Sequence, residues 1–140
     1  MIIDASVWVA IFRADDLHHA VSIHFLETAI AADQDLHVPN LALAEISGVF
    51  SRQTGSSRLA SQTVRAVLAM PRLQRHAFTN PMADRAAILA ASCKLRGADA
   101  VYVSLAEALG LSLVSLDREI LERSSRVVKA LTPADWSRSR

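Results

Sequence analysis

The sequence Ile2-Ile3-Asp4-Ala5-Ser6-Val7-Trp8 decides the fold, because it takes a strand directly into a helix. The two isoleucines are typical of a short buried strand, and residues 5–13 carry apolar side chains at helical spacing. Asp4 lies at the junction of the two elements. The stretch therefore predicts the first step in an alternation of strands and helices.

The rest of the chain continues this alternation. Further strands are predicted at residues 36–39, 73–78, 111–116 and 126–131, and further helices at 16–32, 41–53, 59–70, 81–96, 99–109 and 117–123. Asn40 is predicted to cap the helix that follows it, and Gly97 to end the helix before it. Alternation of this kind favours a parallel sheet covered by helices on both faces.

Length and composition set the broad class. A chain of 140 residues fits one domain, predicted here over residues 1–136 with a frayed tail at 137–140. Hydrophobic residues make up 51% of the chain, but no apolar run approaches the roughly 20 residues that span a bilayer. We therefore expect a soluble protein with no membrane partner. With a single cysteine, Cys93, and no basic leader before an apolar stretch, the sequence also predicts a cytoplasmic location.

Four acidic residues stand at positions where a parallel sheet would gather them. Asp4 closes the first strand and Asp117 follows the strand at 111–116, so both would emerge at the same edge of the sheet. Each of them, like Asp99 after Gly97, could instead simply cap a helix. Glu45 is more telling, because it lies within an apolar helical run, where burial of a carboxylate is unfavourable without compensation.

Taken together, the four acids predict a metal site. Carboxylates within a few ångströms repel one another and must bind either protons or cations. Ligands that are all oxygen favour Mg²⁺ or Mn²⁺ over zinc. Such an ion promotes the hydrolysis of phosphodiester bonds, so the pattern indicates a metal-dependent nuclease. The net charge of +1, in contrast, gives no basic field that would indicate nucleic-acid binding.

The residues around these acids resemble the PIN-domain ribonucleases, and more narrowly the VapC-type toxins of toxin-antitoxin pairs. The resemblance lies in Ile3-Asp4-Ala5-Ser6-Val7-Trp8, the helical Glu45, Ala98-Asp99-Ala100 and Ser115-Leu116-Asp117-Arg118. It covers nearly the whole chain in the right order. Ala5 departs from the pattern, because many members of the family have Thr there.

The resemblance implies a PIN-like three-layer α/β/α sandwich with a central, mainly parallel sheet, and Mg²⁺- or Mn²⁺-dependent endoribonuclease activity. It also implies an RNA substrate, a cognate antitoxin as protein partner, and a homodimer. Carried over by position, Asp4, Glu45, Asp99 and Asp117 are the catalytic and metal-binding acids, and Ser6 and Ser115 support them. Arg118 is a candidate for binding substrate phosphate, and its alternative is a solvated residue in the first turn of a helix.

Two other functions remain open at this stage. One is a phosphotransfer domain that uses Asp4 as phosphoacceptor, with Ser115 and Lys129 beside it, although Glu45 would then have no role. The other is a non-catalytic PIN-like module that only binds a protein or RNA. Trp8 and Tyr102, near the acids in sequence, are expected to pack in the core.

Overall fold

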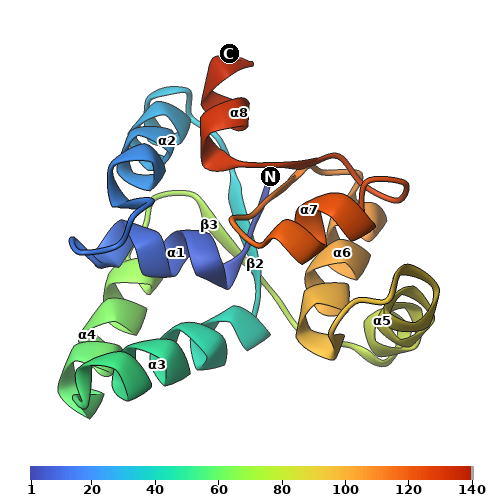
Figure 1. The fold of residues 1–140 in the computed structure, drawn as a ribbon, viewed down its shortest axis with the longest axis horizontal. Coiled ribbons are helices and arrows are strands. Elements are labelled where there is room, and N and C mark those ends of the chain that lie inside the picture. The colour runs from blue at the N-terminus through green and yellow to red at the C-terminus, as the bar shows by residue number, and fades with distance from the viewer. Residues whose placement is uncertain (140) are drawn as a thin grey trace.

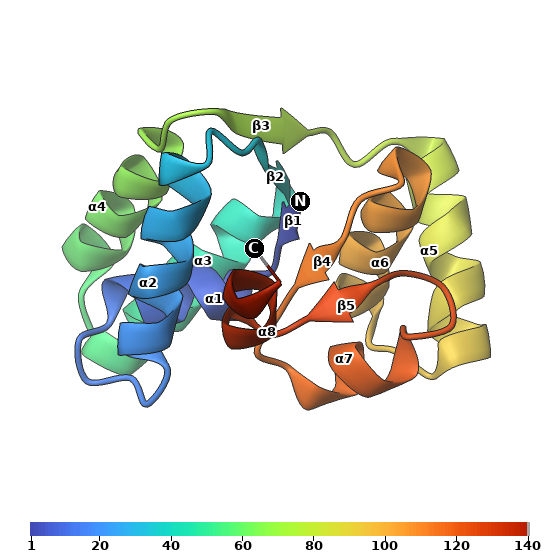
Figure 2. The same ribbon diagram turned by 90° about the horizontal axis from the view of Figure 1, so that it is seen from above.

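The computed structural model describes residues 1–139 and forms a parallel sheet between two layers of helices (Figures 1 and 2). Its elements are β1 (Ile2–Ile3), α1 (Ala5–Phe12), α2 (His19–Ala31), β2 (Leu36–Pro39), α3 (Leu41–Thr54), α4 (Ser57–Leu68), β3 (Leu73–His76), α5 (Asn80–Cys93), α6 (Gly97–Leu109), β4 (Leu113–Val114), α7 (Arg118–Arg123), β5 (Ala130–Leu131) and α8 (Pro133–Arg138). The predicted α/β/α sandwich is confirmed.

The five strands are parallel and lie in the order β3-β2-β1-β4-β5. The chain first builds outward from β1 to β2 and β3, and then returns to the other side of β1 to add β4 and β5. Right-handed crossovers in opposite directions place helices on opposite faces. In Figure 2, α1 to α4 accordingly lie on one side of the sheet and α5 to α7 on the other. The order reverses between β1 and β4, which is where such sheets form their ligand crevice.

The central strands are short but completely buried. Ile2, Ile3, Leu113 and Val114 have no exposed surface, as expected for strands covered on both faces. Backbone hydrogen bonds extend the pairing beyond the strands themselves: the amide of Asp4 donates to Val114 O over 3.0 Å. The start of α1 is therefore fixed directly beside the end of β4.

Several predicted boundaries were wrong, for local reasons. The helix α5 ends at Cys93, where Lys94 takes up a left-handed conformation, and Gly97 begins α6 rather than ending α5. Asn40 precedes α3 but makes no capping hydrogen bond, because its side-chain oxygen accepts from Arg75 Nε instead.

The C-terminal region also differs from the prediction. Residues 137 and 138, expected in a frayed tail, belong to α8, which Thr132 caps by accepting from the amide of Asp135. This helix packs on α2. No helix within residues 1–139 is long and apolar enough to cross a membrane.

Candidate active site

The four predicted acids all line one cavity of about 470 Å³ at the edge of the sheet where β1 and β4 end. This is the point at which the strand order reverses. The lining residues are Asp4, Ala5, Ser6, Val9, Asp16, His18, Glu45, Val49, Arg96, Ala98, Asp99, Leu116 and Asp117. Five separate parts of the fold thus contribute to a single acidic pocket.

Asp4 is the innermost of the acids, with only 5% of its surface exposed. All its side-chain hydrogen bonds reach one oxygen, Oδ2, which accepts from Ser6 Oγ at 2.5 Å, Ser115 Oγ at 2.9 Å and the amide of Ser6 at 3.4 Å. Within residues 1–139 the other oxygen, Oδ1, has no hydrogen-bond partner. Burial raises the pKa of Asp4, the hydroxyl hydrogen bonds oppose that rise, and the negative charge of Asp99 adds to it.

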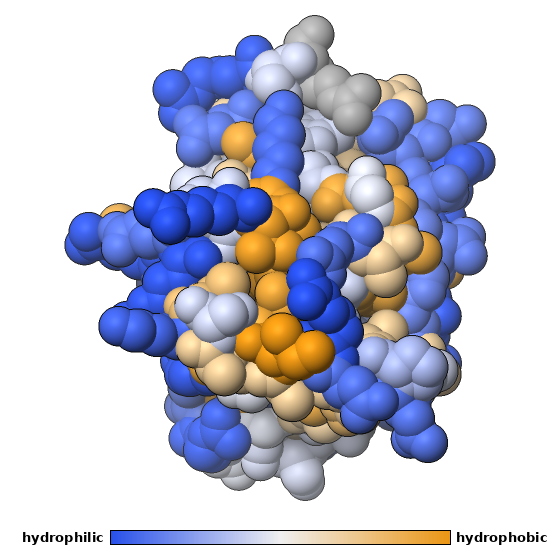
Figure 3. Space-filling model, turned by 90° about the vertical axis from the view of Figure 1, so that its right-hand side faces the viewer, coloured by the Kyte–Doolittle hydropathy of each residue, from blue (hydrophilic) through white to orange (hydrophobic). Residues whose placement is uncertain are grey.

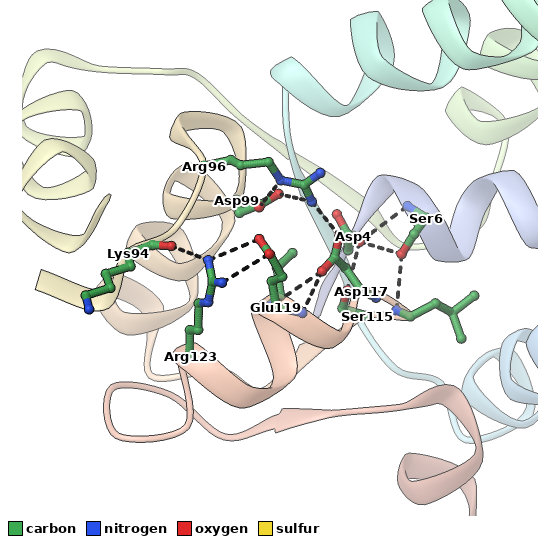
Figure 4. Close-up of polar contacts among 11 residues, drawn as sticks. Asp4, Ser6, Lys94, Arg96, Asp99, Ser115, Asp117, Glu119 and Arg123 are labelled. Atoms are coloured by element: carbon green, nitrogen blue, oxygen red, sulfur yellow. Dashed lines mark hydrogen bonds and ion pairs between the residues drawn. The ribbon is translucent and has the colours of Figure 1, made fainter. Parts of the chain in front are cut away.

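Ser115 joins Asp4 to Asp117. Its hydroxyl donates to Asp4 and accepts from the amide of Asp117 over 3.0 Å (Figure 4). Ser6 makes a similar connection, since its Oγ also accepts from the amide of Leu116 at 3.1 Å. Both hydroxyls therefore hold the end of β4 against the start of α1.

Asp117 caps α7 with one carboxylate oxygen and accepts a hydrogen bond from a cavity-lining residue with the other. Its Oδ1 accepts from the amides of Glu119 at 2.8 Å and Ile120 at 3.4 Å, whereas its Oδ2 accepts from Arg96 Nη2. Asp117 thus caps a helix and lines the cavity at the same time. The same holds for Asp4, which caps α1.

Glu45 reaches the cavity from α3 and is held by Tyr102 of α6. The Tyr102 hydroxyl donates to Glu45 Oε2 over 2.6 Å. Burial raises the pKa of Glu45, the tyrosine hydrogen bond lowers it, and the charges of Asp4 and Asp99 raise it further. Tyr102 is completely buried, as expected, but it also positions a carboxylate.

Asp99 lies inside the first turn of α6 rather than at its cap, and 6% of its surface is exposed. Its partner is Arg96, whose Nε donates to Asp99 Oδ2 at 2.7 Å and whose Nη2 donates to Oδ1 at 3.3 Å. The carboxylate of Asp99 raises the pKa of the Arg96 guanidinium, so this residue is a permanent cation in the pocket.

The carboxylate oxygens of the four acids are suitable ligands for a hard divalent cation, but they do not form a complete coordination site. Within residues 1–139, no group of three or more His, Cys, Asp or Glu side chains lies close enough to hold a metal ion. Arg96 engages Asp99 and Asp117, and Tyr102 engages Glu45. The oxygen-only donor set fits Mg²⁺ or Mn²⁺ in kind, because such ions keep several waters and need few protein ligands.

The structure also shows what sequence reasoning missed. Arg118, predicted to bind phosphate, does not line the cavity; its side chain is 89% exposed and pairs with Glu122 at 3.4 Å. Arg96 lines the cavity instead, and Asp16 and His18 enter it from the loop before α2. A longer helix was predicted there, but the amide of His18 donates to Asp16 Oδ1 in a turn, so α2 starts only at His19.

Comparisons with known proteins agree with this fold. The family model of the PIN domain matches residues 1–125. No curated protein sequence matches the chain. Among solved structures, the chain is similar to Mycobacterium tuberculosis VapC20, described as a Sarcin-Ricin loop cleaving toxin, with 17% identity over 94% of this chain and 98% of that one and a TM-score of 0.75.

Two further solved structures are similar to the chain. FitAcB from Neisseria gonorrhoeae has a TM-score of 0.72, and VapBC2 from Rickettsia felis, bound to a DNA fragment from its promoter, has 0.71. Each is 15% identical, over 94% of this chain and 96% of the other. At such identities the likeness establishes a shared fold.

Proposed function

We propose that this chain, which belongs to the PIN domain family, is an endoribonuclease that hydrolyses RNA phosphodiester bonds with Mg²⁺ or Mn²⁺. The observation that carries the proposal is the convergence of Asp4, Glu45, Asp99 and Asp117 on one cavity at the reversal point of the sheet. The four carboxylates share the cavity with one arginine, Arg96, and no lysine among the described lining residues, and oxygen ligands with excess negative charge favour a hard divalent ion.

Each acid has a distinct part in this proposal. Asp4 offers Oδ1 as a ligand while Ser6 and Ser115 fix Oδ2. Asp117 offers Oδ2 while the amides of α7 fix its Oδ1. When bound, a divalent ion supplies positive charge to the phosphate oxygens and makes water a better nucleophile. Glu45 and Asp99 are the remaining acids proposed to bind the ion.

The phosphotransfer alternative finds less support. It needs a lysine beside Asp4, but Lys129 lines two other cavities and not the acidic one. The non-catalytic alternative predicts no cleavage of any RNA, so it is separated from the proposal by the assay below.

The experiment is cleavage of structured RNA by the purified protein, with Mn²⁺ or with EDTA. We expect cleavage in Mn²⁺ only, and a loss of about 100-fold or more in Asp4→Asn, since even outer-shell changes at metal sites cost 10–100-fold. Asp33→Asn is the matched control, because Asp33 is an exposed acid outside the cavity. Cleavage that persists in EDTA or in Asp4→Asn would refute the proposal.

We further propose that the chain is a toxin controlled by an antitoxin protein. The support is the likeness to VapC20, a toxin, and to a toxin-antitoxin complex from Klebsiella pneumoniae. Expression of the chain alone should then arrest growth, and co-expression with the neighbouring open reading frame should restore it. Growth arrest that Asp4→Asn does not relieve would contradict a toxic nuclease activity.

A further inference from the structure

Among the described residues, Arg96 is the one arginine or lysine that lines the acidic cavity. It precedes α6, and its guanidinium bridges Asp99, on α6, and Asp117, at the start of α7 (Figure 4). The bridge takes up both oxygens of Asp99 and Oδ2 of Asp117. Within residues 1–139, in contrast, the carboxylates of Asp4 and Glu45 accept hydrogen bonds only from hydroxyl and amide groups.

The ion pairs that Arg96 makes with Asp99 and Asp117 can break without unfolding the site. The Arg96 side chain is 63% exposed and that of Asp117 26%, so water can solvate the guanidinium when it leaves the bridge, whereas the Asp99 side chain is only 9% exposed and needs another cation in its place. Within residues 1–139 its Nη1 makes no hydrogen bond, so the guanidinium keeps donors for another acceptor. A guanidinium also matches the oxygens of a phosphate group in geometry and charge.

We propose that Arg96 is a built-in counter-ion, which holds Asp99 and Asp117 in the resting site, yields their oxygens to the divalent cation, and then binds the substrate phosphate. This inference rests on the proposed nuclease function and adds a residue to it. A divalent cation needs the same oxygens that Arg96 occupies and repels its positive charge, so the two compete. Once its guanidinium has left Asp99 and Asp117, Arg96 still lines the cavity. Its positive charge is then available to bind the phosphate of the substrate.

Methionine keeps some of the length of Arg96 but carries no charge. The proposal predicts that Arg96→Met has opposite effects on the affinity for Mn²⁺ and on the affinity for RNA. Mn²⁺ binding without RNA, measured by calorimetry, should become at least about threefold tighter in Arg96→Met, because the ion no longer competes with an ion pair and even a fully exposed pair would account for that change. Arg96→Lys should lie between that variant and the wild type. The matched control is Arg85→Met, which breaks a two-bond pair with Glu107 outside the cavity and should leave Mn²⁺ affinity unchanged.

RNA binding should change in the other direction. In an Asp4→Asn background, which prevents cleavage, and with Mn²⁺ raised until it saturates the weakened site, Arg96→Met should bind a labelled single-stranded RNA roughly threefold to tenfold more weakly. The slope of log affinity against log salt should fall by about 0.7, the value for one phosphate contact on a single strand. Arg85→Met again serves as the control.

A direct readout follows the guanidinium itself. The Nε–H resonance of Arg96, identified by its loss in Arg96→Lys, should shift when Mg²⁺ is added to the RNA-free protein. Mn²⁺ binding that is unchanged or weaker in Arg96→Met would overturn the competition, and unchanged RNA binding would overturn the phosphate role. If the wild type binds no Mn²⁺ and cleaves no RNA, the nuclease proposal itself has failed. If it does both but Arg96→Met matches it, only the present inference has failed.

Discussion

Asp4 shows how one residue serves folding and chemistry together. Its Oδ2 receives the hydroxyls of Ser6 and Ser115, so the side chain is oriented before any ligand arrives. Charge-assisted hydrogen bonds of this kind favour the ionised form, yet burial outweighs them and raises the pKa. The folded protein without metal therefore keeps a carboxylate whose charge is unfavourable.

This imbalance predicts how stability depends on pH without metal. Because the pKa of Asp4 is higher in the folded protein than in the unfolded chain, the folded state binds the proton more tightly. Its stability should therefore fall as pH rises from about 4 through the raised pKa. Glu45, whose pKa is also raised, acts in the same direction.

Asp4→Asn removes one of these titrations and retains a good helix cap. In EDTA at neutral pH, thermal melts should show the variant to be more stable than the wild type, and the difference should close towards pH of about 4. With Mn²⁺ the order should reverse, because only the wild type binds the ion well. A variant that melts below the wild type in EDTA at neutral pH would contradict this reading of Asp4.

Among the elements, α8 shows how a short helix depends on tertiary contact. Its Trp136 is 3% exposed and packs edge-on against Phe25 of α2, with ring centroids 5.1 Å apart. Trp136→Ala should therefore lower the free energy of unfolding by about 3–5 kcal/mol, measured by urea denaturation. Arg138→Ala, on the exposed side of the same helix, should change it by less than about 0.5 kcal/mol. Equal, small effects would mean that this region is frayed after all.

The elements also show what the sequence could and could not predict. Apolar runs such as Ile2-Ile3 identify buried strands because periodicity is a local signal, and the acids at strand ends follow from the parallel topology. Helix α8 escaped prediction because its stability comes from Phe25, far away in the chain. Arg96 escaped for the same reason: an arginine before Gly97 looks like the end of a helix until Asp117 is brought beside it.

At the scale of the whole molecule, the acidic cavity borders an apolar surface. A second groove between α5 and α6 is lined by Leu41, Phe78, Ala83, Ala86, Ala87, Ala90, Gly97, Ala98 and Val101. Ala98 lines both cavities. Apolar side chains gather on the face shown in Figure 3, between hydrophilic groups. Phe78, which lines the groove, is 53% exposed, and exposed apolar patches of this kind mark protein contacts.

We expect this apolar face to join two copies of the chain. Sedimentation or light scattering at micromolar concentration should then give twice the chain mass of 15.2 kDa. Phe78→Glu should shift the protein to monomers without unfolding it, because the side chain is already exposed and a charge in an apolar interface must be desolvated. Leu59→Glu is the matched control: Leu59 is 47% exposed on α4 and should leave the dimer intact. A monomeric wild type would contradict the dimer, and a dimer that Phe78→Glu leaves unchanged would place the interface elsewhere. A dimer through this face would also bring the second copy close to Ala98, which lines the acidic cavity as well. The second copy would therefore restrict the directions from which RNA can reach each site.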